Sequence, residues 1–186
     1  VVGLIFSVLA SAPKRAAAQP GLHIQLGGEY LSSFGRDSES AALGLYGGVA
    51  YSPSRLLSVG ALGAYGALTS TSCEVDGYGA CPWWHPYRVT GELELTPLLH
   101  RHPVDPFFVV DLGIFGQHDS LFGEDPRVAP AGGVGGGAHF FAARFLSADV
   151  ALRFFYAGFG RNEYGYLDFN RTWWALSLGV TPWISL

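Results

Sequence analysis

Charged residues that alternate with apolar ones carry the most chemistry in this 186-residue sequence. Between residues 87 and 97, Arg88, Glu92 and Glu94 share one parity, while Val89 and Leu93 share the other. A period of two predicts a β-strand, whose side chains point alternately to its two faces. Carboxylates and a guanidinium on one face can form ion pairs, bind a polar substrate or line a water-filled pore.

Further segments with the same period carry charges on their polar faces. Five carboxylates there would face two arginines, with a third arginine at the rim, so this face is expected to be acidic. Glu92 and Glu94 lie on one face of one strand, and we expect these two to share a proton or an arginine. The predicted ion network consists of Glu29, Arg88, Glu92, Glu94, Asp111, Asp149, Arg153 and Arg171.

His118 and Ser120 are spaced as a base and a nucleophile could be. A nucleophilic serine needs a base within reach and an acid that orients the base, and Glu124 or Glu29 is a candidate for that acid. However, residues 118–128 are predicted to form a polar loop that begins at His118. An ordinary loop is the favoured interpretation, and we predict no catalytic residue.

Three potential metal ligands, His100, His102 and Asp105, lie on or next to a proline-containing turn. Ordinary turn residues are the favoured interpretation. The glycine-rich run 132–137 is not followed by the Lys-Ser/Thr pair of a phosphate-binding loop. The sequence therefore predicts neither a metal site nor a cofactor.

Cys73 and Cys81 are expected to lie in one loop. In an oxidising compartment outside the cytoplasm they would pair as a disulfide. Closing a loop of this size contributes roughly 2.5 kcal/mol in the chain-entropy model. Two cysteines without further ligands nearby supply too few donors for zinc, so a zinc site is the weaker alternative.

Eight segments show the alternation that predicts strands: 22–31, 41–51, 55–68, 87–97, 106–117, 129–141, 146–156 and 171–184. The first, third, fifth and seventh connections between them are long and polar, and the others are shorter. An even strand number with alternating connection lengths is typical of a transmembrane β-barrel. Segment 129–141 is rich in glycine, so its register is weakly specified.

Composition agrees with a membrane barrel. Hydrophobic residues make up 49% of the chain, yet no apolar run reaches the ~20 residues that a membrane-spanning helix needs. The net charge of -4 includes no basic block, which argues against nucleic acid as a partner. Aromatic residues are expected near both rims, as in the girdles of membrane barrels. These are Tyr30, Tyr65, Tyr87, Tyr156 and Trp174 at the outer rim, and Tyr51, Phe108, Phe140 and Trp183 at the inner rim.

The first 18 residues differ from the rest. An apolar run followed by Ala16-Ala17-Ala18 predicts a secretory signal peptide over residues 1–18, truncated at its start, and a barrel domain over residues 19–186. A short amphipathic helix at the N-terminus is the alternative.

In this whole pattern the chain resembles the small outer-membrane β-barrels of the OmpA/OmpX type, over about residues 20 to 186. The resemblance implies an eight-stranded antiparallel barrel in a bacterial outer membrane. Its partners would be membrane lipid, lipopolysaccharide and the barrel-assembly machinery. Such barrels commonly end in Phe or Trp, whereas this chain ends in Ile184-Ser185-Leu186, and Trp183 is expected to substitute.

Three functions remain open from the sequence. The favoured one is a non-enzymatic envelope barrel with a polar, largely plugged lumen, because eight strands enclose little more than side chains. It would be structural or would bind a surface protein or glycan through aromatic residues in its outer loops. A lipid A-modifying enzyme is the second, since deacylases on small barrels carry a His-x-Ser pair, although Leu121 replaces their Asn. A soluble lipocalin-like barrel with an apolar interior is the third. The loop contact candidates are Tyr78, Trp83, Trp84, Tyr164 and Tyr166.

Overall fold

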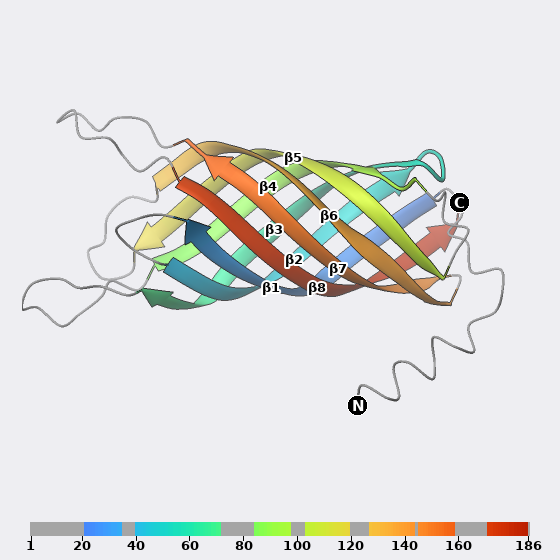
Figure 1. The fold of residues 1–186 in the computed structure, drawn as a ribbon, viewed down its shortest axis with the longest axis horizontal. Coiled ribbons are helices and arrows are strands. Elements are labelled where there is room, and N and C mark those ends of the chain that lie inside the picture. The colour runs from blue at the N-terminus through green and yellow to red at the C-terminus, as the bar shows by residue number, and fades with distance from the viewer. Residues whose placement is uncertain are drawn as a thin grey trace, which may run out of the picture.

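Eight strands form a closed antiparallel barrel in the computed structural model (Figure 1). The structure describes residues 21–34, 40–71, 84–97, 103–119, 127–143, 145–158 and 171–185. The predicted signal peptide lies outside these ranges. The strands are β1 (Gly21–Phe34), β2 (Ser40–Ser52), β3 (Leu57–Thr71), β4 (Trp84–Leu95), β5 (Val104–Asp119), β6 (Arg127–Ala143), β7 (Leu146–Ala157) and β8 (Arg171–Ser185).

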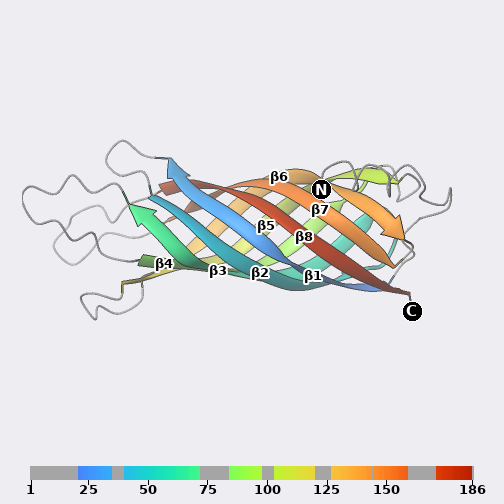
Figure 2. The same ribbon diagram turned by 90° about the horizontal axis from the view of Figure 1, so that it is seen from below.

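Each strand pairs with its sequence neighbours, and β1 pairs with β8 to close the ring. The strands run steeply tilted around the barrel in both views (Figures 1 and 2). We call the end where β1 begins and β8 ends the terminal end. The opposite end, where β1 connects to β2, is the loop end. The predicted contrast in connection lengths is only partly correct, because connection 96–103 at the terminal end is longer than connection 35–39 at the loop end.

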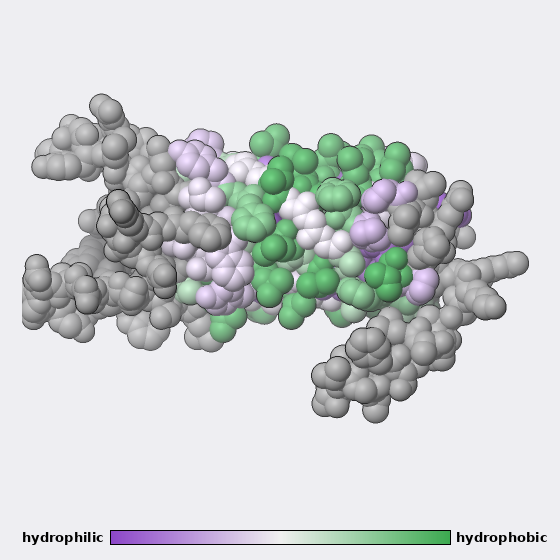
Figure 3. Space-filling model, in the orientation of Figure 1, coloured by the Kyte–Doolittle hydropathy of each residue, from purple (hydrophilic) through white to green (hydrophobic). Residues whose placement is uncertain are grey.

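The outside of the barrel is apolar. Leu45 and Leu112 are 72% and 70% exposed, and the other large exposed side chains on the strands are also hydrophobic. On the face drawn in Figure 3 these hydrophobic side chains gather in a broad band, and more hydrophilic residues lie toward both ends of the barrel. An apolar band outside and polar residues inside is the arrangement of a membrane barrel. The lipocalin-like alternative, which needs the apolar parity inside, is therefore wrong.

In the described residues, no helix is long and apolar enough to cross a membrane.

Most strands extend further than the sequence predicted. β5 begins at Val104 and ends at Asp119, and β6 spans Arg127–Ala143, so each is longer at both ends. The predicted loop start at His118 is wrong, because His118 and Asp119 pair with His85 and Trp84 of β4. Strands of a barrel continue beyond the apolar band, where alternation of polarity no longer marks them.

Trp183 was predicted in the outward-facing girdle of the inner rim, and this is wrong. Its side chain is 6% exposed and lies inside the barrel. Trp183 has the same parity as Thr181, which is buried, whereas Val180 and Ile184 face outward. Register shifts at Leu43/Gly44 and at Phe141/Ala143 mark irregularities in the ladders, which re-aim side chains locally.

Candidate functional site: the interior of the barrel

The barrel interior collects the charged side chains of the polar parity. Six of the eight predicted network residues are at most 7% exposed as whole residues, and the side chain of Asp149 is 10% exposed. The six are Glu29, Arg88, Glu92, Glu94, Asp111 and Arg153. Arg171 begins β8, but its side chain is not described. The charged residues form three groups, ordered below from the loop end to the terminal end.

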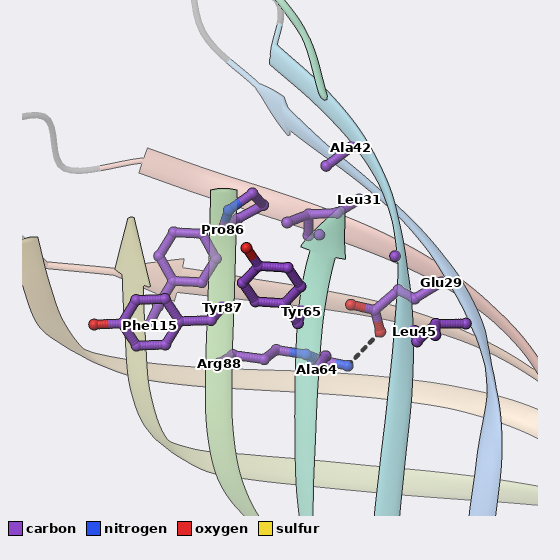
Figure 4. A pocket seen from close by; sticks show the side chains of 12 residues that line it. Glu29, Leu31, Ala42, Leu45, Ala64, Tyr65, Pro86, Tyr87, Arg88 and Phe115 are labelled. Atoms are coloured by element: carbon purple, nitrogen blue, oxygen red, sulfur yellow. Dashed lines mark hydrogen bonds and ion pairs between the residues drawn. The ribbon is translucent and has the colours of Figure 1, made fainter. Parts of the chain in front are cut away.

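The first group is the ion pair of Arg88 and Glu29. Arg88 extends from β4 past Ala64 of β3 to reach Glu29 on β1 (Figure 4), with Nη2 at 2.5 Å from Oε2. Its guanidinium carbon also lies 5.3 Å from the ring centre of Phe155, within the range of a cation–π contact. Ser177 of β8 donates a second hydrogen bond to Glu29 at 3.1 Å. Glu29 is therefore neutralised and hydrogen-bonded at the same time.

The second group is centred on Arg153 of β7. Its Nη2 donates to Glu92 of β4 at 3.0 Å, and its Nη1 donates to Ser177 at 3.1 Å. Its Nε lies 3.5 Å from Asp111 of β5. One guanidinium thus connects four strands, and Ser177 joins this group to Glu29.

The third group surrounds His139 of β6. Its Nε2 lies 3.2 Å from Glu94 and its Nδ1 lies 2.7 Å from Asp149. Asp149 also accepts hydrogen bonds from Ser147 at 2.8 Å and from Thr181. Carboxylate oxygens only accept, so two ionised partners are satisfied when both ring nitrogens carry protons. His139 then acts as the third cation of the interior.

Sequence reasoning missed His139 for an identifiable reason. The residue lies in the glycine-rich strand, whose weak alternation did not indicate which parity faces inward. The predicted sharing between Glu92 and Glu94 is wrong as well, because the two carboxylates have different partners. Glu92 contacts Arg153 and Glu94 contacts His139.

A cluster of apolar side chains fills the interior between the Arg88–Glu29 pair and the loop end. Phe115 lies 4.9 Å from Trp173 and 5.6 Å from Phe155, measured between ring centres. Phe115 and Trp173 have no exposed surface. We call this cluster the upper plug, and its members are Leu31, Ala42, Phe115, Ala131, Phe155, Ala157, Trp173 and Ala175.

Aromatic rings also close the interior at the terminal end. The ring of Trp183 lies 4.2 Å from that of His23, with the two planes tilted by 33°, and 5.6 Å from the rings of both Phe141 and His139. Its Nε1 donates to Ser147 at 3.0 Å, which holds the indole in place. We call Trp183, His23 and Phe141 the lower plug. The three charged groups therefore lie between two layers of rings.

A small pocket lies between the Arg88–Glu29 pair and the upper plug (Figure 4). Small residues of β2 and β3, such as Ala42, Ala64 and Gly66, line it on one side. The space has room for about one water molecule, which is too little for a substrate. The charged groups of the interior instead contact one another, since Arg88, Arg153 and His139 each have a carboxylate partner.

The other predicted site residues are described in part or not at all. Trp84, His118 and Asp119 belong to strands, but their side chains are not described. In the described part of the chain, no group of three or more His, Cys, Asp or Glu residues is placed to hold a metal ion. The residues of these predictions that lie outside the described ranges are Cys73, Cys81, Tyr78, Trp83, His100, His102, Ser120, Glu124, Tyr164 and Tyr166.

Several solved structures resemble this barrel. Neisserial surface protein A is 14% identical, with 88% of this chain and 97% of that chain covered and a TM-score of 0.70. OprG from Pseudomonas aeruginosa is 12% identical, with 92% and 100% covered and a TM-score of 0.60. Ail, the attachment invasion locus protein of Yersinia pestis, in complex with the heparin analogue sucrose octasulfate, is 14% identical, with 88% and 98% covered and a TM-score of 0.57.

No protein-family model matches the chain, and the search of curated proteins gave no match. At sequence identities this low, structural similarity is evidence for a shared fold. Together with the apolar band on its outer surface, it shows that the chain has the closed eight-stranded fold of the small outer-membrane β-barrel proteins.

Proposed function

We propose that this chain is a non-enzymatic, non-conducting barrel of the bacterial outer membrane, with a structural or surface-contact role. The observation that carries the proposal is the closure of the interior at two levels. The upper plug contains Phe115 and Trp173, and the lower plug contains Trp183 and Phe141. Hydrated ions need a continuous aqueous path, whereas an eight-stranded barrel has an interior that side chains can fill.

The groups between the plugs also support a structural role. Each of the three interior cations contacts at least one carboxylate, and each group joins strands that are not sequence neighbours. A polar substrate would have to break buried ion pairs before it could bind. Removing one partner from such a pair costs about 3–5 kcal/mol, so the network is better suited to hold the barrel together.

Conductance in a planar lipid bilayer tests the closed interior. The purified, refolded chain should insert without producing current steps under conditions in which an open porin of known conductance, used as the control, gives them. Stable steps that scale with salt concentration would contradict the proposal. Such a result would favour the pore interpretation of the charged lumen.

The charge of the loop-end connections favours one kind of surface partner. Connections 35–39, 72–83, 120–126 and 159–170 contain two arginines, Arg36 and Arg161. We therefore propose a partner that is cationic, or an anionic one such as lipopolysaccharide that is bridged by divalent cations. The acidic residues in the same connections are Asp37, Glu39, Glu74, Asp76, Glu124, Asp125, Glu163 and Asp168.

Titration with sucrose octasulfate separates this preference from the behaviour of Ail. Because like charges repel, the refolded chain should show no saturable binding of this polyanion, and added Mg²⁺ should increase retention on lipopolysaccharide. Saturable binding of the octasulfate at moderate salt without Mg²⁺ would contradict the proposal. Trp83→Ala and Tyr164→Ala then test whether the predicted contact residues contribute, with Tyr30→Ala on the lipid-facing wall as the control.

The enzymatic alternative depends on Ser120. Wild-type chain and Ser120→Ala are expressed in the same bacterial strain, and the acyl chains of lipid A are compared by mass spectrometry. Unchanged lipid A in both strains is the expected result. Loss of one acyl chain with the wild type, but not with Ser120→Ala, would establish the lipid-modifying activity.

A further inference from the structure

Two carboxyl groups face each other across neighbouring strands in the middle of the barrel. Glu92 of β4 and Asp111 of β5 are register partners, and both point into the interior. Glu92 is 7% exposed and Asp111 is 1% exposed. Residues directly opposite each other in an antiparallel pair have Cβ atoms about 4.5–5.5 Å apart, so the two side chains are close neighbours. This position is distinct from the Glu92–Glu94 arrangement that the sequence suggested.

One cation serves both carboxyl groups. The guanidinium of Arg153 donates to Glu92 at 3.0 Å and lies 3.5 Å from Asp111 through Nε. Arg88, the next cation toward the loop end, is paired with Glu29. His139, the next toward the terminal end, lies between Glu94 and Asp149. If both Glu92 and Asp111 were ionised, Arg153 would balance only one of the two charges. One negative charge would then be buried without a cation.

The oxygens of Asp111 add an independent observation. Within the described residues, neither oxygen has a hydrogen-bond donor, and both atoms are shielded from solvent. A buried carboxylate without donors loses its hydration without gaining the hydrogen bonds that would replace it. Two ionised carboxylates cannot bond to each other because neither has a hydrogen to donate. A proton on one of them removes the excess charge and creates the missing donor.

We propose that Glu92 and Asp111 bind one proton between them, as an O–H···O hydrogen bond that Arg153 holds in place. The pair then carries one negative charge, which the single guanidinium balances. Other groups face it from around the barrel: Arg88 on β4, Glu29 on β1 and Tyr46 on β2. Arg88 and Glu29 form an ion pair of zero net charge, so they do not change the charge balance between Arg153 and the Glu92–Asp111 pair.

Binding of this proton couples folding to pH. The folded barrel holds a proton that the same carboxyl groups release to water in the unfolded chain at neutral pH. Where the folded state binds more protons, stability falls as pH rises. The contribution is therefore complete only below about pH 4, where the unfolded carboxyl groups are protonated as well, and it is lost as pH rises from there through the range in which the folded pair gives up its proton.

Infrared spectroscopy of the refolded full-length chain in lipid at neutral pH detects the proton directly. A protonated carboxyl group has a C=O stretch separated from the bands of ionised carboxylates and of the backbone, and it shifts in D₂O. Glu92→Gln and Asp111→Asn should each lose the intensity of one carboxyl group. Glu94→Gln, on the same strand and face, is the matched control and should keep it.

The wild type alone can overturn the proposal if it shows no protonated carboxyl at neutral pH, so the test does not depend on the variants folding. Retention of the full band in both Glu92→Gln and Asp111→Asn would overturn it too, as would loss of the band in Glu94→Gln alone. A second readout is the stability of the wild type between mildly acidic and mildly alkaline pH. It should fall as pH rises, and the fall should be smaller in Glu92→Gln than in the wild type.

Discussion

Arg153 shows how single residues hold the interior together. Its guanidinium contacts Glu92, Asp111 and Ser177, which belong to three other strands. Arg88 by comparison has one carboxylate partner, Glu29, which keeps a hydrogen bond from Ser177 if Arg88 is removed. The two arginines therefore differ in how much their loss leaves unsatisfied.

Replacing Arg153 by Gln should destabilise the barrel by about 3–5 kcal/mol, the cost of leaving a buried carboxylate without its cation. Arg88→Gln should cost less, because Glu29 retains Ser177. Glu94→Gln should also cost less, because it removes a negative charge from an acidic interior. Urea unfolding in lipid vesicles at pH 7 measures all three. A larger loss in Glu94→Gln than in Arg153→Gln would show that the network is organised differently.

Charge on the lipid-facing wall should be costly according to depth. Leu112 is 70% exposed near the middle of β5, and Tyr156 is 49% exposed close to the loop end of β7. Leu112→Arg is expected to cost about 2–4 kcal/mol, and Tyr156→Arg about 0–1 kcal/mol. The same unfolding assay compares them. Equal costs at the two depths would argue against a membrane centred on the apolar band.

At the scale of elements, the alternation of polar and apolar residues was sufficient to predict eight strands and, except for β6, their inward faces. The partners of each interior side chain were not predictable, because they depend on how neighbouring strands align. Glu92 meets Asp111 only through the register between β4 and β5. His139 reaches Asp149 through the register between β6 and β7, and the glycines of β6 hide that strand's alternation.

Small residues on neighbouring strands make room for large ones. The ring of Tyr46 on β2 lies across Gly27 of β1 and Gly179 of β8, in the positions that their Cβ atoms would take. Gly28, the next residue, faces outward, and a Cβ there would meet its nearest neighbour, the carbonyl oxygen of Gly44, at 3.8 Å. A side chain is therefore sterically excluded at Gly27 but fits at Gly28, the next residue of the same strand.

Gly27→Ala should destabilise the barrel by about 1–3 kcal/mol, because the added methyl group overlaps the Tyr46 ring and the β8 backbone. Gly28→Ala is the matched control and should be neutral or slightly stabilising, since Gly lowers strand stability. Thermal or urea unfolding of both variants decides the point. A loss of stability in Gly28→Ala as large as in Gly27→Ala would contradict the packing described here.

The whole molecule has two unlike ends. At the terminal end Trp183 lies beneath the charged groups, and at the loop end the strands enter the connections that are rich in acidic residues. In the proposed function the loop end lies at the cell surface. The segment 72–83, with both cysteines, is then expected to face the medium.

A membrane-impermeant maleimide should label Cys73 and Cys81 on intact cells only after reduction, because an oxidised pair offers no thiol. Labelling without a reductant would show that the disulfide is absent. No labelling after reduction, with full labelling in lysed cells, would place the segment on the other side of the membrane. The double variant Cys73→Ser with Cys81→Ser should still fold, since the barrel wall does not contain either residue.

The pairing of β1 with β8 has a consequence for the order of assembly. Gly21 lies beside Ser185, so the two strands that meet at this seam are separated by nearly the whole chain during synthesis. Until β8 arrives, β1 presents an unpaired edge to any other strand in its surroundings. Contacts between such distant residues form slowly. If the chain were released before β8 pairs with β1, aggregation would be favoured over closure of the barrel. The unpaired edge of β1 therefore has to be protected until β8 is in place.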